Sequence, residues 1–330
     1  MASYQPPVTI NAKILDLVAQ FNELLGRWVV ESKIALTPKL RRENRIRTIQ
    51  ASLAIEQNTL SVDQVSAVID GKPVMGPPRE IQEVKNAFTV YEQLSNWLPH
   101  SEHHLLEAHQ NLMKGLVEEI GSYRSGGVGI YQKEKLVHMA PPANQVPRLM
   151  GNLLTWLQQT DLHPLVSSCV FHYEFEFIHP FSDGNGRMGR LWQTLILSKW
   201  REELAWLPVE TVVHNRQKGY YQALGLADQA AESTVFVEFM LEALLHALQQ
   251  AIMQNDGVSE EVNDGVNVKL DELDQQLLQF IGKQPYITQE ELVRLTNKSL
   301  STIQRRIRKL RKHHIKRKGA DKDGYWQLLK

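Results

Sequence analysis

Residues 179–190 carry the sequence His179-Pro-Phe-Ser-Asp-Gly-Asn-Gly-Arg-Met-Gly-Arg190. The stretch connects two segments whose apolar residues recur at helical spacing, so it is predicted to follow one helix and begin the next. Within it, Asp183-Gly-Asn-Gly186 is a tight turn whose backbone N–H groups can point into one concavity. A concavity of this kind at a helix N-terminus binds anions, and the aligned peptide dipoles strengthen the attraction.

The side chains of the same stretch suit phosphate chemistry. Arg187 and Arg190 are three residues apart, so on a helix they share a face, and each planar guanidinium can donate two parallel hydrogen bonds to one phosphate. Asp183 offers a hard oxygen ligand of the kind that Mg²⁺ prefers. His179 can accept a proton near neutral pH, because the unperturbed pKa of histidine is about 6.5. Together these groups predict a phosphoryl or nucleotidyl transfer site.

The stretch matches the Fic-domain signature HPFx[D/E]GNGRxxR at every specified position, with Ser182, Met188 and Gly189 in the variable ones. The resemblance covers about residues 40–245, including Phe171-His-Tyr-Glu-Phe-Glu-Phe-Ile before the signature. It implies a mainly α fold, a helical domain of the Fic type with a β-hairpin flap. It also implies a protein adenylyltransferase, which transfers AMP from ATP to a Ser, Thr or Tyr hydroxyl of a target protein.

The resemblance also assigns roles to single residues. His179 would be the base that takes the proton of the target hydroxyl, and Asp183 would hold Mg²⁺ against the α- and β-phosphates. The other positions would bind phosphate: the anion nest of Gly184, Asn185 and Gly186, then Arg187 at the β-phosphate and Arg190 at the γ-phosphate. Phosphoryl-type transfer depends on such positioning and charge neutralisation.

Two further regions gain an expected function from the resemblance. The hairpin predicted at about residues 128–138 would be the flap that pairs with the backbone of the target by strand addition; the alternative is a hairpin without function. Tyr220, Tyr221 and Asp228 would line the adenine pocket. Many members of the family have Asn where this chain has Asp228, which leaves the nucleotide selectivity open.

Upstream, Ser52-Leu-Ala-Ile-Glu56 resembles the inhibitory motif [S/T]xxxE[G/N] of the family, except that Gln57 follows the glutamate. A glutamate that reaches Arg190 would form an ion pair and occupy the arginine that the γ-phosphate needs. The alternative is that Glu56 is an ordinary surface carboxylate. Some inhibited members also remove AMP from proteins, and the sequence does not separate the two directions.

The composition indicates a soluble globular protein and a separate C-terminal part. The 330 residues include 37 Lys and Arg and 37 Asp and Glu, yet residues 269–330 hold 15 basic against 7 acidic residues. Polar, turn-rich residues 255–268 are predicted to be a linker. The predicted organisation is an N-terminal helical region with the inhibitory helix, a catalytic core, the linker and the basic module: residues 1–100, 101–254, 255–268 and 269–330.

No secretory signal and no uninterrupted apolar run of 18 residues is present, so we expect a cytoplasmic protein without membrane contact. A single cysteine, Cys169, excludes a disulfide framework and predicts a buried small hydrophobe.

The basic module resembles a winged helix-turn-helix. Three helices are predicted, with a capping box at Thr288-Gln-Glu-Glu291 and a hairpin around Asp321-Lys-Asp-Gly324. The third helix is expected to direct most of its cations outward: Arg305, Arg306, Arg308, Lys309, Arg311 and Lys312. The positive charge favours DNA contact through residues 269–330, whereas protein docking or dimerisation is the alternative.

Two hypotheses therefore remain. The first is an ATP- and Mg²⁺-dependent protein adenylyltransferase that is inhibited by Glu56 through Arg190. The second is a DNA-binding regulator whose Fic domain senses nucleotide or modifies only itself. Automodification and a homodimer are compatible with both.

Overall fold

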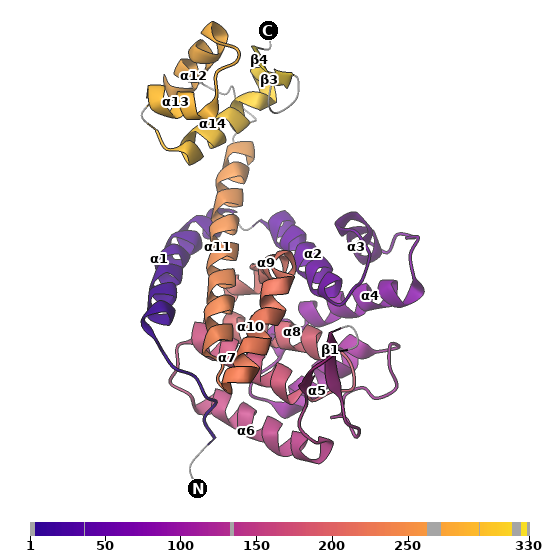
Figure 1. Cartoon of the computed structure of the whole chain (residues 1–330). Helices are drawn as coiled ribbons and strands as arrows, with labels where there is room; N and C mark the ends of the chain where they lie inside the picture. Colours follow the sequence, from indigo (N-terminus) through magenta and orange to yellow (C-terminus); the bar gives the residue numbers. More distant parts are fainter. Residues whose placement is uncertain are drawn as a thin grey trace. The chain divides into compact units, whose positions relative to one another are not determined.

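The computed structural model describes residues 4–35, 37–132, 135–262, 272–296, 298–318 and 325–328. The chain divides into two compact units, Met1–Ser259 and Glu260–Lys330. The described residues are mostly helical and form two small antiparallel sheets, β1–β2 and β3–β4 (Figure 1). The predicted fold class, mainly α with a hairpin in the helical domain and a winged helix-turn-helix after it, is confirmed.

The elements follow one another along the chain. The α-helices are α1 (Ala12–Ala35), α2 (Pro38–Ile55), α3 (Val62–Ile69), α4 (Pro78–Glu92), α5 (Glu102–Met113), α6 (Val146–Gln159), α7 (Pro164–Ile178), α8 (Asn185–Trp200), α9 (Val209–Asn215), α10 (Gln217–Ala230), α11 (Thr234–Val262), α12 (Glu272–Lys283), α13 (Gln289–Thr296) and α14 (Leu300–His313). The 3-10 helices are η1 (Leu94–Asn96), η2 (Ala143–Gln145) and η3 (Glu202–Trp206). The strands are β1 (Gly129–Gln132), β2 (Lys135–Met139), β3 (Ile315–Lys318) and β4 (Tyr325–Leu328).

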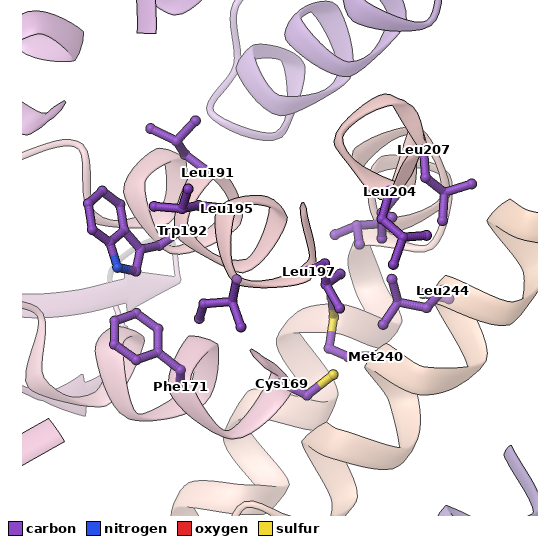
Figure 2. Packing of buried hydrophobic residues seen from close by; sticks show 14 of the residues in the cluster. Cys169, Phe171, Leu191, Trp192, Leu195, Leu197, Leu204, Leu207, Met240 and Leu244 are labelled. Carbon is purple, nitrogen blue, oxygen red and sulfur yellow. The ribbon is translucent and has the colours of Figure 1, made fainter. Parts of the chain in front are cut away.

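Helix α7 is the centre of the larger unit, because 13 of its 15 residues are buried. Its neighbour α8 packs against it, and α6 covers another side of α7. Figure 2 shows side chains from α7, α8, η3 and α11 in one buried cluster, among them Cys169, Trp192 and Met240. Cys169 is buried as predicted, and burial raises the pKa of its thiol to about 12.

Helix α11 combines high hydropathy with burial in this core. Its segment Thr234–Met253 is long and apolar enough to cross a membrane, with a mean hydropathy of 1.3, but 61% of the segment is buried within the protein. Phe236, Leu244 and Leu248 are fully buried there. The apolar composition of α11 is therefore explained by packing against the other helices.

The hairpin β1–β2 occupies the predicted position between α5 and α6. Its register pairs Gly129 with Met139 and Gln132 with Lys135, and shifts between Ile130 and Tyr131. Residues 133–134 at its turn lie outside the described residues. β2 also contacts α10, so the hairpin leans on a helix of the domain.

The start of the predicted linker is helical. α11 continues to Val262, so residues 255–262 extend a helix where a linker is predicted. Extending an existing helix adds one hydrogen bond per residue without a new nucleation cost, so a polar sequence can follow an apolar one in the same helix. Residues 263–271 lie outside the described residues.

The smaller unit has a core of its own. Its buried residues include Leu277 and Ile281 of α12 and Ile303, Ile307 and Leu310 of α14. The predicted capping box is present, because the Thr288 hydroxyl accepts from the Glu291 N–H at 3.2 Å and the Glu291 carboxylate accepts from the Thr288 N–H at 2.8 Å. The wing strands β3 and β4 pair antiparallel; the predicted turn 321–324 lies outside the described residues.

One cation of the third helix is placed differently from the prediction. Arg306 does not point freely outward, because its guanidinium bonds to the fully buried Asp274 carboxylate at 3.2 Å. A buried carboxylate needs a partner, and this arginine supplies it. Arg311 is exposed as predicted, whereas the side chains of Arg305, Arg308, Lys309 and Lys312 lie outside the described part.

Candidate active site

The signature loop lies between the C-terminus of α7 and the N-terminus of α8. His179 ends α7 in the left-handed region at φ 49°, and Gly184 precedes α8 at φ 86°. Glycine is required at position 184 for two reasons. The positive φ favours a residue without a Cβ, and a Cβ there would lie 2.6 Å from the Met113 sulfur. These two residues turn the chain so that the N-terminus of α8 faces the side chains of α2 and α4.

Buried side chains hold the backbone of the loop. Arg124 donates to the carbonyl oxygens of His179 at 2.7 Å and Pro141 at 2.6 Å, while its own N–H donates to Pro180 O at 2.9 Å. Asn185 accepts from the Phe181 N–H at 2.9 Å and donates to Phe181 O at 2.8 Å. The Asn185 side chain therefore holds the backbone of the loop itself.

His109 supports the loop from α5. Its ring stacks on Phe181 with centroids 3.6 Å apart. The Gly121 N–H donates to Nδ1 at 3.1 Å, so Nε2 carries the proton that is donated to Asp183 O, also at 3.1 Å. Burial lowers the pKa of His109 to about 4, which keeps the ring neutral.

The anion nest faces the Glu56 carboxylate. A Cβ added at Gly186, in the first turn of α8, would collide with Glu56 Oε1, so the carboxylate lies against the helix N-terminus. Negative charge is favourable at this end of a helix, because the backbone N–H groups and the peptide dipoles are directed at it. Glu56 itself is the C-cap of α2, and its side chain is 35% exposed.

Arg190 bonds to the segment that the sequence predicts to be inhibitory. Its guanidinium donates to Glu56 Oε1 at 2.8 Å, to the Ser52 hydroxyl at 3.1 Å and to Ser52 O at 3.0 Å. Burial, the largest single influence, lowers the pKa of Arg190, but the charge and hydrogen bond of Glu56 together with the charges of Tyr220 and Glu176 outweigh it, so the net pKa is raised. The structure thus brings Ser52 and Glu56 to Arg190 over 134 or more residues of sequence.

Arg187 belongs to a second ionic group, a ring of two arginines and two carboxylates. Its guanidinium lies 3.0 Å from Asp183 Oδ1 and 3.3 Å from Glu83 Oε1. Arg79 of α4 closes the ring at 3.2 Å from Asp183 Oδ2 and 3.7 Å from Glu83 Oε1. Asn58, two residues after Glu56, donates to Glu83 Oε2 at 2.8 Å.

His179 lies at the edge of this site with 21% of its side chain exposed. Its Nδ1–H donates to the backbone oxygen of Glu176 at 3.3 Å, so Nε2 is the nitrogen that accepts a proton. The Glu176 carboxylate is 3.9 Å from the same Nδ1. A histidine whose Nδ1–H is fixed by a hydrogen bond and whose Nε2 carries a lone pair is suited to act as a base.

The three predicted adenine-pocket residues lie on α10. Tyr220 is buried and pairs with His172 Nε2 at 3.0 Å, and burial raises its pKa well above the usual value. Tyr221 is 40% exposed; burial and then the Glu56 charge raise its pKa, so it faces the same site. Asp228, two turns further along, accepts a hydrogen bond from Tyr173 at 3.0 Å.

Several residues of the site have no clear signal in the sequence. Glu83 and Arg79 come from α4, Arg124 from the segment before β1, and His109 from α5. Only Glu176 could have been found, because it lies three residues before His179 and shares a helix face with it.

Comparisons with known proteins agree with this geometry. A model of the Fic/DOC family matches residues 99–197, and a model described as winged helix-turn-helix DNA-binding matches residues 270–315. The chain is 50% identical to a Fic family protein from Desulfovibrio desulfuricans G20 whose crystal structure is known. The match covers 99% of this chain and 98% of that one, with a TM-score of 0.75.

Two curated relatives are named as protein adenylyltransferases. The protein adenylyltransferase fic-1 of Caenorhabditis briggsae is 29% identical over 202 residues, which are 58% of this chain. The protein adenylyltransferase Fic of Nematostella vectensis is 28% identical over 211 residues, 60% of this chain. The match spans 38% and 47% of the length of these two relatives.

Proposed function

The chain belongs to the Fic family, and from this we propose that it is an ATP-dependent protein adenylyltransferase held inactive by Glu56. The observation that carries the proposal is the position of the Glu56 carboxylate. It lies against Gly186 at the N-terminus of α8 and bonds to Arg190, so an anionic group of the protein occupies a site built for anions. A nucleotide phosphate is the ligand that such a site would bind once Glu56 leaves.

In the proposed reaction, the oxygen of a Ser, Thr or Tyr hydroxyl attacks the α-phosphorus of ATP. The bond from that phosphorus to the oxygen bridging toward the β-phosphate breaks, and pyrophosphate leaves. The hydroxyl proton passes to Nε2 of His179, whose Nδ1–H is held by Glu176 O. The backbone N–H groups at Gly184 to Gly186 and the side chains of Arg187 and Arg190 stabilise the phosphate charge.

The donor set fits Mg²⁺. Asp183 provides one carboxylate beside the anion nest, and Mg²⁺ usually takes one or two protein carboxylates and completes its shell with water and substrate phosphates. When bound, the ion would neutralise phosphate charge during transfer. Asp183 contacts Arg79 and Arg187, so these two arginines keep its charge balanced before the nucleotide enters.

Inhibition would act on both phosphate-binding arginines. Glu56 takes Arg190 directly, and Asn58 holds Glu83 against Arg187. Helix α2 is fixed for this role at its end, because Gln217 of α10 donates to Ile55 O at 2.9 Å. The inhibitory segment would therefore occupy the β- and γ-phosphate positions together.

The hairpin β1–β2 supports a docking function for the target. Its strands pair only with each other among the described residues, so an outer edge remains to which an extended target segment can add. Strand addition binds the target through hydrogen bonds to its backbone rather than through one particular side chain. This mode of binding suits an enzyme that modifies an extended segment of a protein.

The proposal is tested with isotope-labelled ATP and Mg²⁺ on the full chain, with intact mass as the second readout. We expect little transfer by the wild type, strong automodification or lysate labelling by Glu56→Gly, and none by Glu56→Gly/His179→Ala. Glu43→Gly, on the same helix α2, controls for the helix-weakening effect of glycine. Chelation of Mg²⁺ should abolish the labelling.

Other outcomes identify other functions. Transfer from a different nucleotide would keep the site and change the donor, which the Asp228 position makes worth testing. Loss of AMP from a pre-labelled protein, dependent on Glu56, would assign AMP removal. Without either reaction, the transferase proposal is wrong.

A second function, DNA contact, is favoured by the smaller unit. Exposed cations lie on its second helix, the following turn, the third helix and the wing: Arg294, Lys298, Arg311, Lys316 and Lys318. Since the matched family model is described as DNA-binding, we propose that this unit contacts the phosphate backbone of DNA. Such contact could localise the transferase or its regulation to DNA.

A further inference from the structure

Glu176 is a buried carboxylate next to the proposed base. It lies on α7, three residues before His179, and only 6% of it is exposed. Its carboxylate is 3.9 Å from Nδ1 of His179, and its backbone oxygen accepts from the same nitrogen at 3.3 Å. Glu176 therefore faces Nδ1 of His179 with two groups, its backbone carbonyl dipole and its carboxylate charge.

The packing around Glu176 keeps its carboxylate in place. A Cβ on Gly189, in the first turns of α8, would lie 2.8 Å from Oε1, so glycine at this position leaves room for the carboxylate. His172 Nε2 is 3.8 Å from Oε1. The Glu176 carboxylate thus packs between α7 and α8 in space that is open because residue 189 has no side chain.

His172 does not act as the cationic partner of Glu176. Its Nδ1–H donates to Gln193 Oε1 at 2.7 Å, and its Nε2 accepts from the Tyr220 hydroxyl at 3.0 Å. Burial lowers the pKa of His172 to about 3, so the ring is neutral near pH 7. Among the described residues, further groups that interact with the Glu176 charge include Arg190 from α8 and Tyr220 and Tyr221 from α10.

Arg190 is already paired with Glu56 in this state and would pair with phosphate in the active one. Arg124 faces the His179 backbone oxygen, not the ring. His179 is therefore a titratable group beside Glu176 whose protonation the carboxylate can influence during a reaction. An opposite charge within ~4–6 Å favours the protonated imidazole and raises the pKa of the base.

We propose, on the premise of the function proposed above, that Glu176 is a positioning residue for His179. It keeps Nδ1 protonated and Nε2 directed at the target hydroxyl. When Nε2 takes the hydroxyl proton, the carboxylate stabilises the resulting imidazolium, and no proton moves to Glu176 itself. The role resembles that of any buried carboxylate behind a histidine base.

The test compares Glu176→Gln with Glu174→Gln in the full chain. Glu174 is a matched control, because it is a buried carboxylate on the same helix that bonds to Tyr4 instead. The pH titration of His179 is followed by NMR with ¹³C-labelled histidine, and its signal is assigned by its loss in His179→Ala. We expect Glu176→Gln to lower the pKa of His179 by about one unit, and Glu174→Gln to leave it unchanged.

A kinetic arm uses the same substitutions in the Glu56→Gly background. Glu176→Gln should lower kcat by about tenfold while KM for ATP changes less than about twofold, and should move the acid limb of the pH profile to lower pH. Glu176→Asp, which keeps the charge, should recover part of both effects. An unchanged titration of His179 in Glu176→Gln, or an equal shift in Glu174→Gln, would overturn the proposal.

The two arms separate the two proposals. If Glu56→Gly transfers no AMP at any pH, the proposed function fails, while the NMR titration still decides whether Glu176 controls His179. If AMP is transferred but the titration does not move, only the positioning role is wrong.

Discussion

At the scale of single residues, the segment proposed to be inhibitory contains a backbone feature that explains the usual glycine or asparagine of its motif. Gln57 follows the C-cap of α2 with φ 71°, in the left-handed region. A residue with a Cβ is disfavoured there by ~1–2 kcal/mol, whereas glycine and asparagine enter this region readily. The chain departs from the motif in its side chain but keeps the backbone conformation that the motif favours.

We predict that Gln57→Gly stabilises the protein by about 1 kcal/mol, because relief of the left-handed strain exceeds the entropy that glycine gains in the unfolded chain. The midpoint of urea unfolding measures the change. Gln93→Gly is the control, since Gln93 caps α4 at φ −88° and has no strain to relieve. Destabilisation of both variants by the same amount would contradict the explanation.

The neutral His109 predicts a loss of stability in mild acid. Burial lowers its folded pKa to about 4 from an unfolded value of about 6.5, so the unfolded chain binds more protons between these two values. This contribution is complete above pH 6.5 and is lost as the pH falls toward 4. Between pH 7 and pH 5 it amounts to about 2 kcal/mol.

Urea unfolding of the wild type and His109→Phe at pH 7 and pH 5 measures the effect. The phenylalanine keeps the stack on Phe181 but loses the bonds to Gly121 and Asp183, so it should be less stable at pH 7 and less sensitive to pH. Equal pH dependence of the two proteins would exclude His109 as the cause.

At the scale of elements, α2 and α4 meet the start of α8 with two carboxylates, Glu56 and Glu83. An ion pair with a buried guanidinium must be broken before a phosphate can use the same arginine. Removing Glu56 alone takes the carboxylate away from Arg190, which keeps its hydrogen bonds to Ser52, and leaves Arg187 bound to Glu83 and Asp183. The two helices would therefore inhibit ATP binding in separable steps.

We predict that Glu56→Gly/Glu83→Gln binds ATP several-fold more tightly than Glu56→Gly, because Arg187 loses one competing carboxylate. Calorimetric titration with Mg²⁺-ATP gives the two dissociation constants. Glu80→Gln is the matched control on α4, since Glu80 bonds to Thr59 and not to Arg187. Weaker ATP binding after Glu83→Gln would mean that Glu83 orients Arg187 for the nucleotide instead of competing with it.

At the scale of the whole molecule, the two units differ in charge and therefore in their expected partners. The net charge of the chain is zero, but residues 269–330 hold an excess of eight positive charges. Contact with DNA phosphates releases counterions, so binding through this unit must weaken as salt rises.

We predict that the full chain binds double-stranded DNA with a strong salt dependence. Arg311→Gln and Lys316→Gln should each weaken binding and reduce the log–log salt slope by about one. Fluorescence anisotropy of labelled DNA, measured from about 50 to about 200 mM salt, gives the slope of log affinity against log salt concentration. Lys39→Gln, which removes an exposed cation of the other unit, should leave the DNA affinity and the salt slope unchanged. If the full chain does not bind DNA even at low salt, the DNA-binding prediction is wrong and protein docking is favoured.

Much of this molecule could be predicted because its signals are local. Helical spacing predicts α7, and turn and capping residues predict the hairpin and the start of α13. The twelve-residue signature places its base, its nest and its two arginines on one turn and one helix face, which short-range geometry fixes. The sequence by itself therefore determines the helical class and the family, and it places the candidate site at residues 179–190.

Only the tertiary structure decides which distant residues surround that loop. Glu83, Arg124 and His109 reach it across other helices, and no spacing along the chain encodes such contacts. Burial decides the outcome, since a buried guanidinium or imidazole must find a partner wherever the fold provides one. For the same reason Arg306 turns inward to Asp274, although its position on the helix suggested an exposed cation.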